Sequence, residues 1–531
     1  MAKPAHLRAD LLSGFLVFLI ALPLCLGISL AGGVPAISGV LTAIVGGLVA
    51  SFLGSSRLTI KGPPAGLIVI VLGASMELSD DPIVAYHRLL AVSVVSGLLQ
   101  IVLALLRAGT LGDLMPSSVI HGMLAAIGVI IIAKQAHVAL GVTPMAGEPL
   151  GLLMEIPHSL LHPNPAVFLI GGLALIMLFG LPLLKIGWLK KIPAPMLVLL
   201  MAIPLGLYFN LGTEHTYQMF GNSYTVGPKF LIQLPGSLLG SLAFPDFSVI
   251  FTPVSIKYIV MFLLVGSIES LLTVSAVDTI DPEKQTSDIN KDYLATGIAN
   301  TVAAFIGGTP GISEIVRTRA NIDNGAKTAW ANFFHGAFLL LSLALIPGVI
   351  QMIPQAALAA MLVYTGYRLA APKEFAHAYH VGVEQLFLFS VTLAVTVSTD
   401  LLIGVATGLV CKILLHLKNG APIKSMLKAI VKEEEKDGRL TLTVHESAIF
   451  TNFLAIKTRL QGVGPEVKEV VIDFDNAWVV DHTVLDKLDR FASKWEGERK
   501  LTLTGLGEHT AMSSHSLAAR RKQRREKLVS A

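Results

Sequence analysis

The sequence has few charged residues and almost no cysteine. Only 14% of its 531 residues are Asp, Glu, Lys or Arg, and two are Cys. A soluble domain normally carries about a quarter of its residues as charges, so this composition excludes a soluble globular protein. A hydrophobic content of 53% and a mean hydropathy of +0.69 indicate a polytopic membrane protein instead. Both cysteines lie in apolar stretches, where we expect packing rather than a disulfide.

The sequence also lacks the residue patterns of common catalytic and metal sites. No cluster has the ligand spacing of a zinc site, and no serine, histidine and aspartate set suggests a hydrolase. We therefore expect neither an enzyme nor a cofactor other than a coupling ion. The net charge of +4 comes from basic loops and from a basic stretch at 520–525. Such a stretch is more typical of a chain end beside an anionic membrane than of nucleic-acid binding.

Apolar stretches that could cross a membrane recur from residue 11 to residue 417. Each has about 17 to 25 residues, enough for a helix across a hydrocarbon core of about 30 Å. The first is too long for a cleaved signal peptide and is expected to remain. Twelve full spans and two short broken ones give fourteen. This number puts most basic loops, including Lys185, Lys190 and Lys191, on the side of both termini, which predicts a cell inner (plasma) membrane protein with cytoplasmic termini.

Two hydrophobic segments begin with a glycine and proline break, at 61–66 and at 307–313, and are then too short to cross alone. Each break predicts a half-helix that starts inside the membrane, and such pairs mark transport sites. Opposed helix N-termini would form an anion cradle from backbone amides. The alternative is that the prolines only kink two packed helices. The expected substrate-binding residues are Pro64, Ala65, Gly66, Gly311, Ile312 and Ser313, the last with its hydroxyl as an additional donor.

Glu269 lies about halfway along an apolar span. A carboxylate there costs at least about 2.5 kcal/mol on insertion scales, so we expect it to face a cavity and to have a function. In transporters that function is often to bind a proton or a sodium ion. Thr273, one helical turn later, could add an oxygen ligand. A structural hydrogen bond to a neighbouring helix is the alternative.

Three further residues are accessory candidates for the site. Glu314 is favoured by the dipole at the start of the second half-helix, yet it would compete with an anion if it faced the site. It either points away, toward Arg317, or is itself a protonation site. Arg317 either attracts anions or anchors the inner side of the membrane. Cys25, in the first span, is the third.

The composition changes abruptly after residue 417. We expect a transmembrane domain at 1–417, a polar linker at 418–437, a small cytoplasmic domain at 438–510 and a basic disordered tail at 511–531. Within the small domain, stretches with strand alternation interleave with stretches of helical spacing, which indicates an α/β fold.

This carboxyl-terminal domain resembles the STAS domain, shared by sulfate transporters and anti-sigma-factor antagonists, in the stretches 470–474 and 480–483. In the antagonists the residue after the aspartate is a phosphorylatable serine, whereas here it is His482. A phosphorylation switch by that route is therefore not expected, although Thr483 could still be modified. We expect Asp481 to cap the following helix.

The membrane part resembles the SulP family of sulfate permease-like anion transporters, which includes bacterial bicarbonate and sulfate types. The matching stretches occur in the family's order, at 21–24 with 32–35, 62–63, 265–270 and 308–318. The resemblance implies seven spans repeated with inverted topology, a core domain that carries the site, and a gate domain. It also implies a homodimer and an acidic cation-coupling position at Glu269.

The expected function is secondary active transport of an inorganic anion by movement of the core against the gate. Bicarbonate is the first choice of substrate and sulfate the next, with Na⁺ or H⁺ as coupling ion. One alternative is a nucleobase:cation symporter, of the same fold and with glutamates in spans eight and ten, as Glu269 and Glu314 would be; the STAS-like tail argues against it. Another is a SulP-type anion channel or exchanger. The expected partners are the anion, membrane lipid and a second copy of the chain, but no nucleic acid.

Overall fold

The computed structural model describes residues 6–109, 115–184, 192–219, 221–235, 239–283, 285–427, 429–436, 438–464, 466–495 and 499–522. Lys185, Lys190 and Lys191 of an expected inner loop, and the tail after Lys522, lie outside these ranges. The chain forms two compact units, Met1–Gly109 with Ile127–Ala370, and Thr110–Ala126 with Ala371–Ala531.

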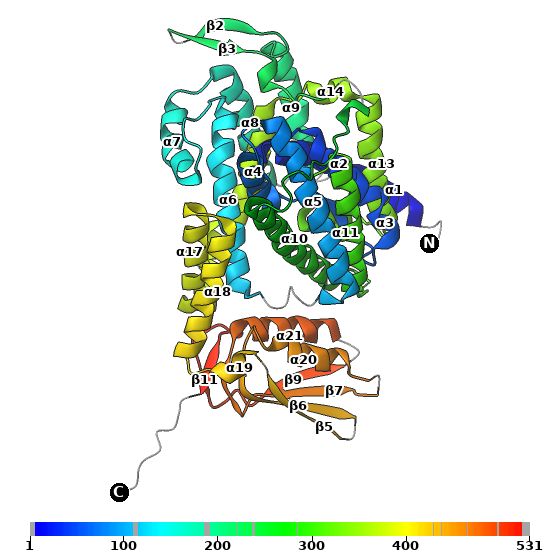
Figure 1. Cartoon of the computed structure of the whole chain (residues 1–531), viewed down its shortest axis with the longest axis vertical. Helices are drawn as coiled ribbons and strands as arrows, with labels where there is room; N and C mark the ends of the chain where they lie inside the picture. The colour runs from blue at the N-terminus through cyan, green and yellow to red at the C-terminus, as the bar shows by residue number, and fades with distance from the viewer. Residues whose placement is uncertain are drawn as a thin grey trace. The chain divides into compact units, whose positions relative to one another are not determined.

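The larger unit is built of apolar helices (Figure 1). Across the described residues, six helices are long and apolar enough to cross a membrane by length and composition, and shorter apolar helices lie between them. The helices of this unit are α1 (Leu7–Ala31), α2 (Ile37–Leu48), α3 (Ala50–Leu53), α4 (Ile68–Glu77) preceded by the 3₁₀ turn η2 (Ala65–Leu67), α5 (Pro82–Leu105), α6 (Ser117–Leu140, shared with the smaller unit), α7 (Pro149–Leu161), α8 (Pro165–Gly180), α9 (Ala194–Tyr208), α10 (Pro253–Ile280), α11 (Ile289–Phe305), α12 (Ile315–Asp323), α13 (Trp330–Leu345), α14 (Pro347–Gln351) and α15 (Gln355–Leu369).

The fold is the expected one, a polytopic helical membrane protein of two seven-span halves with a small α/β domain. The fourteen expected spans correspond to α1, α2, α4, α5, α6, α8, α9, α10, α11, α12, α13 and α15, followed by α17 (Val383–Ser398) and α18 (Leu401–Lys418) of the smaller unit. The short elements α4 and α12 are therefore the third member of each half. A hairpin of β2 (His215–Met219) and β3 (Asn222–Val226) follows α9.

Several helices begin at side chains that satisfy their free first-turn amides. Asp81 precedes Pro82 at the start of α5 and accepts hydrogen bonds from the amides of Ile83 and Val84 at 2.8 and 3.3 Å. Thr252 before α10 and Asp288 before α11 have the same role. Such caps let a helix begin at a fixed residue, with proline favoured at its first position.

Small residues bring the helices around the site into close contact. A Cβ at Gly47 of α2 would lie 2.6 Å from the Cα of Gly336 on α13, and one at Gly97 of α5 would lie 2.6 Å from Oγ1 of Thr301 on α11. In membranes, where helices associate largely by packing and hydrogen bonds, such small residues allow backbones to approach. The helices that flank the two breaks are thus held tightly.

The two breaks meet as a pair of short strands. β1 (Ile60–Gly62) and β4 (Ile312–Glu314) run antiparallel, with Lys61 opposite Ser313 and Gly62 opposite Ile312. The first half-helix starts at Ala65, as the break predicts, but the second starts at Ile315. Ile312 and Ser313 therefore lie in a strand and not in the first turn of a helix, because the chain extends to pair with β1 before it turns.

The smaller unit contains the last two spans and the α/β domain. In its sheet, β6 pairs in parallel with β7 and β8, and β7 pairs in parallel with β9. The other pairs are antiparallel, so the sheet is mixed, and α20 and α21 lie on one face of it (Figure 1). The sheet order is β10-β11-β8-β6-β7-β9, and β5 pairs with β6. The remaining elements are α16 (Pro372–Val381), α19 (Ile423–Leu427), β5 (Ile430–Lys436), β6 (Arg439–Ala448), α20 (Phe453–Gln461), β7 (Glu469–Asp473), β8 (Ala477–Val480), α21 (His482–Trp495), β9 (Lys500–Thr504), β10 (His509–Ala511) and β11 (Arg520–Lys522).

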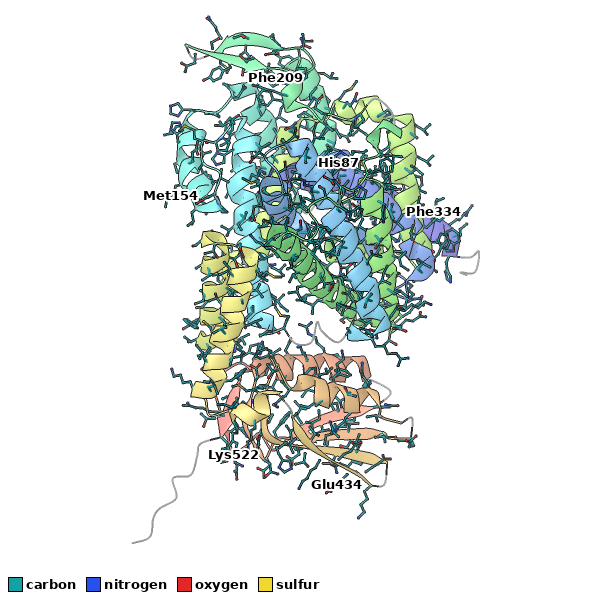
Figure 2. All side chains as sticks on the ribbon, viewed as in Figure 1. His87, Met154, Phe209, Phe334, Glu434 and Lys522 are labelled. Atoms are coloured by element: carbon teal, nitrogen blue, oxygen red, sulfur yellow. The ribbon has the colours of Figure 1, made fainter. Side chains whose placement is uncertain are left out.

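Two boundaries of this domain differ from those expected. The charged stretch expected as linker forms β5, an edge strand from which Glu434 projects outward (Figure 2). Charged residues on an edge strand protect it from pairing with other chains, which explains why its sequence resembles a linker. Part of the expected disordered tail forms β11, where Lys522 pairs with Glu508 at 2.8 Å and Asp475 at 3.2 Å.

Asp481 does not have the expected capping role. Its Oδ1 accepts a 2.7 Å hydrogen bond from Nζ of Lys412 on α18, and Nε2 of His416 lies 3.6 Å from Oδ2. Burial alone would raise the pKa of Asp481, but the charges of Lys412 and His416 outweigh it and hold this pKa well below its usual range. The adjacent Thr483 is fully buried, so its hydroxyl is not accessible for modification.

We predict that Asp481→Asn strongly destabilises the protein. The change leaves the Lys412 ammonium buried without its carboxylate, and breaking a buried pair from one side costs about 3–5 kcal/mol. The thermal unfolding midpoint in detergent should fall, and the double variant Lys412→Met/Asp481→Asn should recover most of the loss. Arg490→Ala, which removes an exposed pair with Asp486, is the control. Equal losses in Asp481→Asn and the control would contradict the prediction.

Candidate functional site

The first half-helix begins with an uncapped N-terminus. Pro64 precedes it in an extended conformation, and no side chain caps its first turn. Ala65 at its start and Glu269 on α10 are both half-buried, so neither is sealed within the protein. A Cβ at Gly66 would collide with the Glu269 carboxylate. A side chain at position 66 would therefore displace the acid, which packs directly against the start of the half-helix.

Glu269 has an incomplete set of partners. Its Oε1 is fully buried and has no hydrogen-bond partner among the described residues. Thr273 is buried one turn later on the same helix. A carboxylate with an unsatisfied buried oxygen is a group that can take up a proton or a small cation. The position expected from the sequence for the coupling ion therefore has the chemistry for that role.

Arg317 is fully buried, with 1% of its surface exposed. Its Nη2 donates to the carbonyl oxygen of Pro63 at 2.9 Å, whereas Nε and Nη1 have no partner among the described residues. A Cβ at Gly62 would collide with Nη1. The guanidinium is thus held against the first break, and no carboxylate of the described residues pairs with it. Burial of a charge without a counterion is costly, so this side chain favours a bound anion.

Glu314 caps the second half-helix. It is the N-cap residue of α12, and its Oε2 accepts a 2.7 Å hydrogen bond from the backbone amide of Arg317. The Glu314 carboxylate is thus directed toward Arg317, to its backbone amide and not to its guanidinium. The N-terminus of α12 already holds a negative charge, so the two half-helices differ: the first is open and the second is capped.

The remaining substrate-binding candidates lie around β4 and are already bonded within the protein. The Gly311 amide donates to Oδ1 of Asn300 at 2.8 Å, and the Ser313 amide to Oγ of Ser270 at 3.3 Å. The Ser313 hydroxyl accepts a 2.5 Å hydrogen bond from Nζ of Lys61. These groups hold the paired strands β1 and β4, which we call the strand crossing, in place. Within it, Ile312 pairs with Gly62. Among the expected amides, those of Ala65 and Gly66 lie at the open helix end.

Two other polar groups lie near Arg317. Cys25 of α1 is buried within the range over which the charges of Arg317 and Glu314 act on its thiol. His335 of α13 is fully buried within range of the Arg317 charge, and neither ring nitrogen is hydrogen-bonded among the described residues. The sequence analysis did not identify His335, although a histidine within an otherwise apolar span was a usable signal.

The charges of the site are unbalanced. Lys61 and Asp292 form a buried pair with Nζ and Oδ2 2.5 Å apart, so they cancel. Arg317 supplies one further positive charge, while Glu269 and Glu314 supply two negative charges if both are ionised. The site is then net negative and repels an anion. When Glu269 carries a proton or a cation, its negative charge is neutralised. The helix end and Arg317 can then attract an anion.

Two broken helices that meet at a strand pair, with an open helix end and a buried arginine, define a membrane transporter of the inverted-repeat class. The chain belongs to the sulfate permease family, whose model matches residues 7–392. YvdB of Bacillus subtilis (strain 168) is 28% identical over 406 residues, which cover 76% of this chain and 72% of YvdB.

Two further comparisons agree with this family. The bicarbonate transporter BicA of Synechocystis sp. is 25% identical over 442 residues, or 83% of this chain and 75% of BicA. The solved overall structure of SLC26A9 superposes with a TM-score of 0.67 at 15% identity, over 95% of this chain and 85% of SLC26A9. The chain is thus an inorganic anion transporter of the membrane, and the nucleobase:cation symporter alternative loses its support.

We predict that Gly66→Ala strongly reduces transport while the protein still folds. The added methyl group displaces the Glu269 carboxylate from the start of α4. Anion uptake into proteoliposomes should fall at least about tenfold, as for other misplacements of binding groups. Gly172→Ala on α8, where the nearest atom would lie 3.7 Å away, is the control and should keep its uptake. Wild-type uptake in Gly66→Ala would show that this helix end is not the site.

Proposed function

We propose that this protein is a secondary active transporter that brings bicarbonate across the plasma membrane together with Na⁺ or H⁺. The observation that carries the proposal is the buried Arg317 guanidinium, with two nitrogens that lack partners among the described residues. It lies against the break that precedes the open half-helix, and both groups favour an anion.

The charge of the site favours a monoanion over a dianion. With Glu269 neutral, the charges of Arg317 and Glu314 sum to zero, and the open helix end, equivalent to roughly half a positive charge, accommodates one negative charge better than two. Bicarbonate is a monoanion near neutral pH and sulfate is a dianion, so bicarbonate is our first choice. A relative named a bicarbonate transporter supports this choice, and the family's description keeps sulfate as the second.

Coupling would follow from the charge of Glu269. The anion binds well only when this carboxylate is neutralised, so cation and anion enter together. The binding groups would belong to the core domain, which would carry both ions past the gate domain. A channel or exchanger of the same family would not require this neutralisation. Glu269 is only half-buried, which supports access of a cation to it.

We further propose a homodimer with both termini in the cytoplasm, in which the STAS-like α/β domain regulates or dimerises the protein. The buried pair between Lys412 of the last span and Asp481 of this domain supports a rigid connection. Through such a connection, a movement of the STAS-like domain would be passed on to α18, the last span. Position 482, a histidine, and the buried Thr483 argue for a mechanism other than phosphorylation.

We predict that Arg317→Ala greatly weakens anion binding, whereas Arg319→Ala does not. Both residues belong to α12, but Arg319 is exposed and pairs with Asp323. Loss of a charge-assisted contact in a buried site is worth about 1.5–3 kcal/mol, or roughly 10- to 100-fold in affinity. Uptake of labelled bicarbonate and sulfate, measured as KM in proteoliposomes, tests this. Similar KM changes in both variants would contradict the assignment.

We predict that Glu269→Gln uncouples transport from the driving ion. The amide mimics the neutral carboxyl, so anion binding should persist while the dependence of uptake on an imposed Na⁺ or H⁺ gradient is lost. Uptake should be followed with each gradient separately. Glu77→Gln, an exposed acid at the end of α4 that pairs with Lys257, is the control. Wild-type currents that need no gradient would favour the channel alternative instead.

A further inference from the structure

Lys61 is a charged side chain at the centre of the strand crossing, and it is almost completely buried. Its Nζ donates to Oδ2 of Asp292 and to Oγ of Ser313, both at 2.5 Å. The Lys61 amide is fixed by Oδ1 of Asn332 at 3.1 Å. A lysine normally keeps its ammonium in water, so this placement needs a specific reason.

The atoms around the ammonium form a set of oxygen ligands. Asp292 supplies a carboxylate from α11 and Ser313 a hydroxyl from β4. The Ser270 hydroxyl on α10 lies 3.3 Å from that of Ser313, and Ser313 Oγ lies 3.3 Å from Asp292 Oδ2. One carboxylate with neighbouring hydroxyls is a set that hard cations prefer. The ammonium contacts Asp292 and Ser313 of this set directly, and Ser270 is linked to it through Ser313.

A small pocket borders Lys61. It is also lined by Gly62 of β1, Ile312 of β4, and Thr42, Thr296 and Asn300, and it has room for about one water-sized group. Shortening the lysine would free the space between this pocket and the present partners of the ammonium, Asp292 and Ser313. The crossing would then contain a polar cavity large enough for a small metal ion.

We propose that Asp292, Ser313 and Ser270 form a second cation site of the transporter, distinct from Glu269, which the chain fills with its own Lys61 ammonium. The tethered charge replaces a free alkali cation and holds β1 against β4 without one. This inference rests on the proposed function only for its effect on anion binding. The cation site itself follows from the buried oxygen set.

The charge balance gives the consequence for transport. Without Lys61, the Asp292 carboxylate adds an uncompensated negative charge beside Ser313, one residue from Glu314. Anion binding should then weaken until a free cation takes the place of the ammonium. Na⁺ should therefore become a requirement at this second site.

The test is Lys61→Ala in the full-length protein, with NaCl replaced by choline chloride at constant ionic strength. In choline the variant should be less stable than wild type, and Na⁺ should raise its Tm by at least about 2 °C more than it raises that of wild type. Its affinity for labelled bicarbonate should rise about tenfold with Na⁺, a usual size for coupling between two ligands.

Lys61→Ala/Asp292→Asn removes both charges and should lose the additional Na⁺ response while it remains folded. Lys134→Ala removes a lysine that donates to the carbonyl oxygen of Ala31 and has no carboxylate partner among the described residues, and it should show no additional response. The proposal would be overturned if Lys61→Ala folds but Na⁺ raises its Tm no more than it raises that of wild type. It would also be overturned if the additional rise in Tm persists in the double variant. If Lys61→Ala does not fold in either salt, the Tm shift measured on Lys61→Ser, which also shortens the side chain, decides in the same way.

The two proposals fail separately. The Tm response to Na⁺ needs no transported anion, so it reports on the cation site even if wild type transports neither bicarbonate nor sulfate. Absence of uptake by wild type would reject the proposed function alone. Normal uptake by wild type without a Na⁺ response of Lys61→Ala would reject the second cation site alone.

Discussion

The antiparallel pairing of β1 with β4 is the constraint on which the rest of the membrane part depends. Backbone outside a helix cannot remain unsatisfied within a bilayer, so two interrupted spans are tolerated only if their breaks bond to each other or to buried side chains. The pairing of residues 60–62 with 312–314 provides part of this, and Asn300, Asn332 and Ser270 provide more. Once the breaks are joined, both half-helices must start at the same place, and a binding site follows.

The same pairing makes the site asymmetric. Gly62 and Gly66 leave room for Arg317 and Glu269 at the first break. At the second, the chain remains extended until Glu314, whose carboxylate satisfies its own helix. An open positive helix end therefore lies opposite a capped one. In the proposed function, attraction of an anion would depend on Arg317 and on the state of Glu269, and this dependence would be the physical basis for coupling an anion to a cation.

The sequence was sufficient to predict the class of fold, the two breaks and the position of Glu269, because each leaves a local signal: apolar length, a glycine and proline pair, or an acid within an apolar span. It could not locate the start of α12, since strand pairing with residues about 250 positions away decides where the helix begins. The role of Arg317 was left open because its burial depends on contact with Pro63. β5 was missed because an exposed edge strand has no apolar alternation.

Glu269 and Asp292 show how partners decide the function of a buried acid. Asp292 is held by Lys61, by the Ser313 hydroxyl and by the Ser56 amide at 3.2 Å, so its charge is balanced within the protein. Glu269 has a buried oxygen without a partner among the described residues and is only half-buried. Both acids are near the same pair of strands, but in the proposed function only Glu269 exchanges its cation with the solution. A tethered cation on one side and an exchangeable one on the other would keep the crossing intact throughout the cycle, while the charge that controls the anion changes.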